Sequence, residues 1–118
     1  MARLKDLLGE ILRIAGTQIV VIVGRDGFVI EEVSNTEEIE FETVGAVLSN
    51  EIRSLESMGG ELGVGKATQG LVEFEDGVIV TSVLNEDAIL AVVSNSKANL
   101  GNIRFQVKKR KSAVQDAL

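Results

Sequence analysis

Apolar residues recur at helical spacing in three stretches of the chain, near its two ends and in its middle. Each stretch has one apolar face and one polar face, which is the pattern of an amphipathic helix packed on a core. Gly16 follows the first stretch and Met58-Gly59-Gly60 follows the second, so we expect these residues to end the helices. The predicted helices span residues 2–14, 40–57 and 99–117.

Between these helices, runs of β-branched and aliphatic residues predict five strands. The runs at 19–23 and 88–93 are continuously apolar, which is typical of central strands that are covered on both faces. Asp26-Gly27, and the short polar segments before residues 78 and 88, have the composition of hairpin turns. The predicted strands span residues 19–23, 28–33, 66–75, 78–84 and 88–94.

The resulting order of elements is α-β-β-α-β-β-β-α, with no repeat and no low-complexity segment. We therefore predict a single domain over residues 1–118. Its class is α/β (α+β), with one five-stranded, mostly antiparallel sheet and helices on both faces. A domain of this size is marginally stable alone, and oligomerisation is a common remedy.

The residue types that are missing from the sequence exclude several classes of function. The sequence has no Cys and no His, which excludes Cys-type zinc sites, thiolate nucleophiles and the commonest general base. We expect a binding module and not an enzyme, with no catalytic residue, cofactor or metal site. No apolar run reaches the roughly 18 residues of a membrane span, and the N-terminus does not read as a secretory signal. We therefore expect a cytoplasmic protein without membrane insertion.

Residues 60–67 come close to the phosphate-binding loop G-x-x-x-x-G-K-[ST]. Ala67 stands where that loop needs a hydroxyl for Mg²⁺, and Thr68 comes one residue late. The loop must also follow a strand and open a helix, because the helix N-terminus helps to bind the phosphates. Here a helix precedes the segment and a strand follows it, so we interpret it as a glycine-rich connection.

Two pairs of neighbouring acids are candidates for acid–base or metal-binding groups. Glu31 and Glu32 lie in a predicted strand, where adjacent side chains point to opposite faces and do not converge. Glu37 and Glu38 precede a predicted helix, where acids favour the helix N-terminus. We expect solvated or capping roles for all four.

Charge is unevenly distributed along a chain whose formal net charge is −6. Residues 26–87 hold fifteen acids and two bases, whereas residues 97–118 hold six bases and one acid. This asymmetry indicates either a basic patch for an acidic partner or for a second copy, or ordinary solvated helix faces. Four consecutive bases, Lys108 to Lys111, spread around a helix axis and lack an aromatic stacking residue. We favour a solvated helix end over phosphate or membrane-surface contact, and expect no nucleic-acid partner.

The middle helix carries small and short polar residues beside its apolar stripe, namely Gly45, Ala46, Ser49 and Asn50. Small side chains permit close approach of a second helix, although they also suit packing onto a sheet. Gly in a helix interior costs roughly 1 kcal/mol relative to Ala, so Gly45 indicates a packing constraint. We favour a self-association face.

The stretch Ala91-Val92-Val93-Ser94-Asn95-Ser96-Lys97-Ala98-Asn99-Leu100-Gly101-Asn102-Ile103-Arg104 resembles the strand-to-helix signature of Roadblock (dynein light chain) domains. Ala-Asn-Leu-Gly at 98–101 is its most specific part. The short first helix, the strand at 19–24 and the Asp26-Gly27 turn fit the same family, so the resemblance covers nearly the whole chain. It implies a profilin-like fold.

The resemblance also implies a homodimer or heterodimer, in which the third strands pair across a two-fold axis and the middle helices pack together. Family members of bacteria and archaea resemble regulators of small Ras-like GTPases, and eukaryotic relatives are scaffold subunits or dynein light chains. Where a family member stimulates GTP hydrolysis, the implied mechanism is a change in the GTPase's own active site without an inserted arginine. An exposed Arg53 on the middle helix would also allow the alternative, in which this chain inserts an arginine finger.

The leading hypothesis is a homodimeric module that docks and regulates a small Ras-like GTPase. The alternative is a scaffold that assembles other proteins without altering a nucleotide cycle, and an enzymatic role through Glu31 or Lys66 is a weak third. The predicted partner-binding residues are Ala46, Ser49, Asn50 and Arg53. The predicted dimer interface comprises Val44, Gly45, Leu48, Ser49, Ile52, Thr68, Gly70 and Val72.

Overall fold

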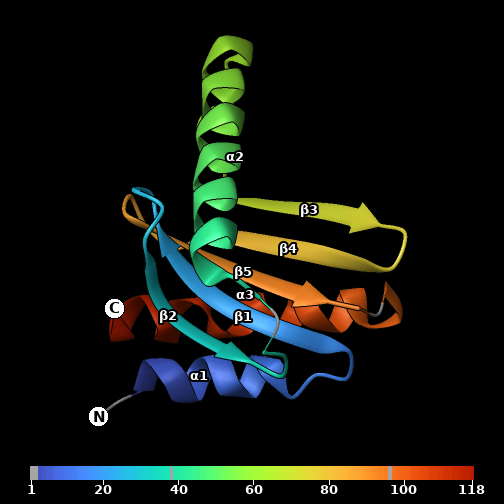
Figure 1. Cartoon of the computed structure of the whole chain (residues 1–118). Helices are drawn as coiled ribbons and strands as arrows, with labels where there is room; N and C mark the ends of the chain where they lie inside the picture. Colours follow the sequence, from blue (N-terminus) through green and yellow to red (C-terminus); the bar gives the residue numbers. More distant parts are fainter. Residues whose placement is uncertain (1–2, 38, 96) are drawn as a thin grey trace.

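A computed structural model describes residues 3–37, 39–95 and 97–118. It contains one sheet and three α-helices in the predicted order, which confirms the fold class (Figure 1). A single turn of 3₁₀-helix, η1, precedes the last helix. The elements are α1 (Arg3–Leu12), β1 (Thr17–Gly24), β2 (Val29–Ser34), α2 (Phe41–Leu62), β3 (Gln69–Phe74), β4 (Gly77–Val83), β5 (Ala88–Ser94), η1 (Lys97–Asn99) and α3 (Leu100–Ala117).

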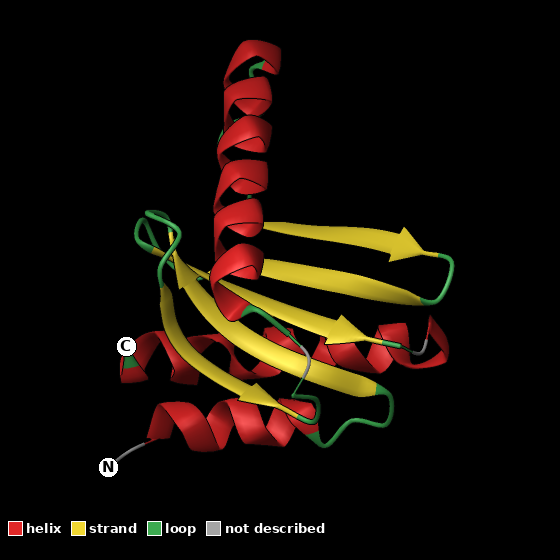
Figure 2. Ribbon diagram, in the orientation of Figure 1, coloured by secondary structure: helices red, strands yellow, loops and turns green. Residues whose placement is uncertain are grey.

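The five strands form one sheet in the order β2-β1-β5-β4-β3, and every neighbouring pair is antiparallel (Figure 2). β1 and β5 lie in the centre, as their continuous apolar runs predict, and their residues are almost all buried. Register is set within this pair by Val20 opposite Val92 and Ile22 opposite Leu90. β2 and β3 are the edge strands, and β3 is largely exposed.

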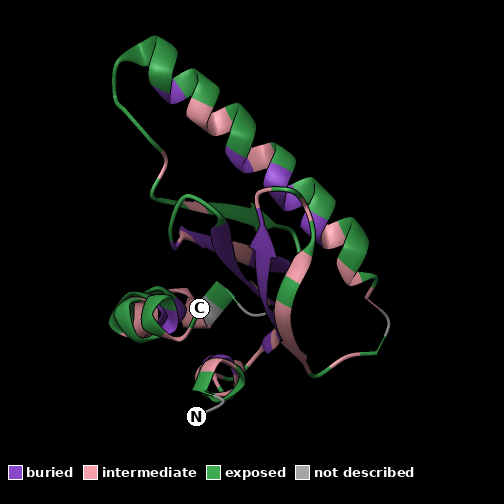
Figure 3. Ribbon diagram, turned by 90° about the vertical axis from the view of Figure 1, so that its left-hand side faces the viewer, coloured by how far each residue is buried: buried purple, intermediate pink, exposed green. Residues whose placement is uncertain are grey.

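Alternation along the central strands builds one core on each face of the sheet. Val20 and Ile22 of β1 face α1 and α3, whose apolar stripes cover that side. Ile19, Val21 and Val23 face the other way and pack against Leu48 and Ile52 of α2. Figure 3 shows α2 on one side of the sheet and α1 and α3 on the other, which confirms the prediction of helices on both faces.

The prediction that Met58-Gly59-Gly60 ends the middle helix is wrong, because α2 continues to Leu62. It stops at Gly63, whose φ of 72° is left-handed and whose N–H donates to the carbonyl of Gly60. A glycine inside a helix destabilises it by only about 1 kcal/mol relative to alanine. Gly59 is also buried against the backbone of Gly65, where the chain after the helix folds back over it. As a result, the C-terminal half of α2 extends past the sheet (Figure 1).

The predicted start of the third strand is also wrong, whereas the exposure of Glu37 agrees with a solvated role. β3 begins at Gln69 and not at Lys66, because Lys66 to Thr68 connects the end of α2 to the sheet. α2 begins after Glu40, so Glu37 is an exposed loop residue and the acid of the first helical turn is Glu42. Glu38 lies outside the described residues.

Candidate functional site

A groove of about 440 Å³ lies between the β1–β2 turn and the outer side of α2. All four predicted partner-binding residues, Ala46, Ser49, Asn50 and Arg53, line it. The turn contributes Phe28, whose side chain is 75% exposed and which the sequence analysis did not single out. The structure therefore brings the predicted residues together and adds one large apolar side chain to them.

The turn that carries Phe28 is held tightly against the helix. Gly27 has a φ of 91°, and the Phe28 N–H donates to Asp26 Oδ1 at 3.1 Å. On the helix, a Cβ at Gly45 would lie 2.5 Å from the carbonyl oxygen of Gly27. Gly45 therefore permits close approach of this chain's own turn, which accounts for the packing constraint that the sequence indicates.

Arg53 is exposed but engaged by its own chain. Its Nη2 donates to the carbonyl oxygen of Arg25 at 3.0 Å, and its Nη1 donates to Asn50 Oδ1 at 3.2 Å. Arg25 in turn forms a two-pronged ion pair with Glu56 of α2, in which Nη2 and Oε2 are 3.0 Å apart. These contacts tie the start of the β1–β2 turn to one side of α2 and fix one wall of the groove.

Hydrogen bonding from Arg25 lowers the pKa of Glu56, as do the charges of Arg25 and Lys66, while burial acts in the opposite direction. A carboxylate whose pKa is lowered on folding stabilises the protein above its ordinary pKa of 4.5, and this contribution disappears as pH falls through the folded pKa. We expect Glu56→Gln to lower the free energy of unfolding at pH 7 by about 1 kcal/mol. The difference from wild type should shrink below pH 4.5, as followed by urea unfolding across pH.

Glu51→Gln is the matched control, since it removes a carboxylate from the same helix that has no ion pair among the described residues. Its stability should track that of wild type across the same pH range. If Glu56→Gln kept its full deficit below the folded pKa of Glu56, the contact would not depend on the ionised carboxylate, contrary to this prediction.

The predicted dimer-interface residues differ in how far they are buried within the chain. Gly45, Leu48, Ser49 and Ile52 are buried within the chain. Their side chains therefore have almost no surface to offer a second copy. Val44 is half-buried, and the remaining three lie in or next to the exposed edge strand: Thr68, Gly70 and Val72.

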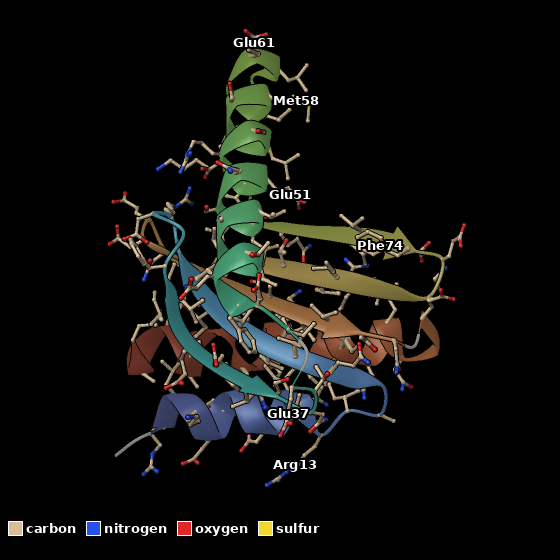
Figure 4. All side chains as sticks on the ribbon, in the orientation of Figure 1. Arg13, Glu37, Glu51, Met58, Glu61 and Phe74 are labelled. Atoms are coloured by element: carbon tan, nitrogen blue, oxygen red, sulfur yellow. The ribbon has the colours of Figure 1, made fainter. Side chains whose placement is uncertain are left out.

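Exposed apolar residues lie on that edge strand and on the C-terminal end of α2, and of these the sequence predicts only Val72 as an interface residue. Val72 is opposite Ile79 in the sheet, so it faces the side on which α2 lies, and Phe74 two residues on shares this face. In Figure 4 the Met58 side chain projects from α2 toward the side where β3 lies. Met58 and Leu62 are 53% and 67% exposed. Met58 and Leu62 continue the helical spacing of the apolar residues after Leu55, and this spacing is the signal for them in the sequence.

The other motifs of the sequence have structural roles. α2 precedes residues 63–68 and β3 follows them, so no helix N-terminus faces this glycine-rich connection. Oε1 of Glu31 lies 3.7 Å from Nζ of Lys5 in α1. Glu32 lies opposite Val21 and faces α2, so the two carboxylates are on opposite faces of the sheet and do not converge. Within the described residues there is no group of three metal-ligating side chains, and no helix there is long and apolar enough to cross a membrane.

Comparison with known proteins gives the chain relatives in archaea. A family model described as the Roadblock/LC7 domain matches residues 3–94. Two uncharacterized proteins of Methanocaldococcus jannaschii are each 30% identical over 109 residues, which cover 92% of this chain and 94% of each relative.

Solved structures share the fold at lower sequence identity. MglB of Myxococcus xanthus superposes with a TM-score of 0.90 at 14% identity, over 97% of this chain and 93% of that one. The gliding protein MglB of Thermus thermophilus has a TM-score of 0.89 at 19% identity, over 98% and 87% of the two chains. A Roadblock/LC7 domain of Streptomyces avermitilis has a TM-score of 0.85 at 20% identity, over 96% and 95%. The match over residues 3–94 and the shared fold establish that the chain belongs to the Roadblock/LC7 domain family.

Proposed function

We propose that this protein is a homodimeric module that docks and regulates a small Ras-like GTPase, and that it contributes no chemistry of its own. The observation that carries the docking site is the groove beside α2, where the four predicted contact residues meet the exposed Phe28. The family resemblance supplies the class of partner. Since such a partner requires GTP, we place the protein in the cytoplasm.

The dimer is supported by the surface around β3. This strand pairs with β4 on one side only, and an unpaired edge offers backbone N–H and C=O groups to another strand. Antiparallel pairing of two β3 strands would continue the sheet and place both copies of α2 on the same face. Val72, Phe74, Met58 and Leu62 would then be covered by the second copy, which explains why these apolar side chains are exposed in one chain.

The docking groove is independent of that surface, because it lies on the side of α2 next to the β1–β2 turn. Phe28 is a large, rigid anchor of the kind that dominates protein interfaces. Asn50 provides a short polar group at the rim, whereas Ser49 is buried and donates its hydroxyl to the carbonyl oxygen of Ala46. Arg53 is already bonded to Arg25 and Asn50, which favours a role in shaping the groove over insertion as an arginine finger.

The test is a titration of the purified protein against the small Ras-like GTPases of the same genome, with complex formation and GTP turnover measured together. We expect one GTPase to bind and its turnover to change by about tenfold or more. Phe28→Ala should remove the anchor, and Ala46→Arg should fill the groove. Each should weaken binding by about tenfold or more.

Phe105→Ala is the matched control, because Phe105 is an exposed phenylalanine on α3, on the other face of the sheet. It should bind as wild type does. A complex that forms without any change in turnover would reject regulation in favour of the scaffold alternative, and the absence of any complex would reject both.

A further inference from the structure

A second concave site lies on the opposite side of the molecule, between α3 and the β3–β4 edge of the sheet. Its volume is about 240 Å³. Val80 of β4 and Val107 of α3, both buried, form an apolar floor. The proposed GTPase groove lies on the α2 side of the sheet, so the two sites are separate.

Three cations of α3 line this cavity: Arg104, Lys108 and Lys111. They occupy positions i, i+4 and i+7, which fall on one face of a helix. Arg110 turns away from them and pairs with Glu10 of α1, with Nε and Oε1 2.8 Å apart. The four consecutive bases at 108–111 therefore point in different directions. Lys108 and Lys111 join Arg104 in a stripe that lines the cavity beside the sheet.

The charge of this stripe is not neutralised by the chain. No acidic residue lines the cavity, and among the described residues none of its three cations has a carboxylate within ion-pairing distance. By contrast, three other basic residues, Lys5, Arg25 and Arg110, each pair with a glutamate. An unpaired basic cluster in a chain of net charge −6 creates a local positive potential suited to an anion.

A buried hydroxyl points to a ligand independently of the charges. Ser82 is only 6% exposed and lines the cavity. It lies opposite Leu90, a residue of the core beneath α1 and α3, so its side chain faces α3. Its hydroxyl takes part in none of the side-chain hydrogen bonds within the described part of the chain, so it is available to a group in the cavity.

We propose that this cavity binds a phosphoryl group, with Arg104, Lys108 and Lys111 contacting its oxygens and Ser82 donating a hydrogen bond. Guanidinium and ammonium groups are the usual ligands of phosphate, and three of them match an anion with two or more charges. No aromatic residue lines the cavity, which disfavours stacking of a nucleobase. The site does not depend on the proposed GTPase function.

The test is a calorimetric titration of the full chain with inorganic diphosphate, at low salt. We expect binding that the double variant Arg104→Gln/Lys108→Gln weakens by about tenfold or more. Ser82→Ala should weaken it by about threefold or more, since it removes one hydrogen bond. Circular dichroism of each variant verifies that the fold is retained.

Lys109→Gln is the matched control, because Lys109 is an exposed neighbour that does not line the cavity. Lys108→Gln alone is measured beside it and removes the same charge. Lys109→Gln should change diphosphate affinity by less than about twofold, and Lys108→Gln by more. Equal losses for the two variants would overturn the proposal by showing diffuse charge attraction. Absence of diphosphate binding at low salt would overturn it as well.

A parallel flotation experiment distinguishes the source of the phosphoryl group. Phosphatidylcholine vesicles with and without a phosphatidylinositol phosphate are mixed with the protein. Co-flotation that requires the phosphorylated lipid and is displaced by diphosphate supports the site and assigns a lipid headgroup. Diphosphate binding without co-flotation supports the site and assigns a soluble phosphate compound. Co-flotation that diphosphate cannot displace contradicts binding of the headgroup in this cavity.

Discussion

The double variant Met58→Glu/Val72→Glu is expected to be a monomer at concentrations where we expect the wild-type protein to be a dimer. Both side chains are exposed in one chain, at 53% and 37%, so neither substitution removes a contact of the core. In the proposed dimer, both are covered by the second copy. Two-fold symmetry would then bring four new carboxylates into one apolar interface.

We expect the dissociation constant of the dimer to rise by about a hundredfold or more, which corresponds to roughly 2.7 kcal/mol. Light scattering coupled to size-exclusion chromatography, over a dilution series, measures the shift. Circular dichroism should show an unchanged content of helix and strand.

Phe105→Glu is the control for this experiment, since it places a carboxylate at an exposed phenylalanine of α3, away from β3. It should remain dimeric. A wild-type protein that is monomeric at high micromolar concentration, or a double variant that stays dimeric, would contradict pairing through β3 and α2.

Gly45→Ala is expected to destabilise the protein by about 1–3 kcal/mol, although alanine is the better helix former. The added methyl group would lie 2.5 Å from the carbonyl oxygen of Gly27 and 3.2 Å from Cγ1 of Val23. Relief would require α2 to lift from the sheet or the β1–β2 turn to move. Thermal and urea unfolding measure the loss.

Gly60→Ala, in the same helix, should instead raise the free energy of unfolding. Nothing lies within 4 Å of a Cβ at Gly60, so the substitution gains helix propensity without a clash. We expect stabilisation of up to about 1 kcal/mol. Loss of stability in both variants, or gain in both, would show that the contact between α2 and the turn does not govern Gly45.

The order and type of the elements follow from local patterns. The run at 19–23 is short, entirely β-branched and has no polar residue to place in solvent, which predicts a strand covered on both faces. Its hairpin to β2 needs a left-handed residue, and Gly27 has a φ of 91°. These features depend on residues that are neighbours in the chain, which is why the sequence alone predicts them.

The sequence predicts only one wall of the proposed docking groove. The spacing of Ala46, Asn50 and Arg53 places them along one side of a helix, and the sequence shows this directly. Phe28 comes from a turn far away in the chain, and its exposure depends on how that turn rests on α2. Without the tertiary fold, Phe28 reads as an ordinary strand residue.

The sequence likewise does not decide that Gly45 and Ser49 of α2 are buried within the chain. A glycine in a helix indicates close approach of something, but the approaching group is a turn of the same chain and not a second helix. The end of the helix was misplaced for a similar reason. Gly59 and Gly60 are weak helix breakers, and contact between Gly59 and the returning chain allows the helix to continue.

By itself, therefore, the sequence determined the elements, their order, the two-sided sheet and the absence of His and Cys chemistry, because these depend on composition and on short-range periodicity. Only the tertiary structure decided which face of the sheet each helix covers, which apolar residues stay exposed, and which bases converge. Arg104, Lys108 and Lys111 become a site only because β3 and β4 lie against them, and such long-range packing has no local signature.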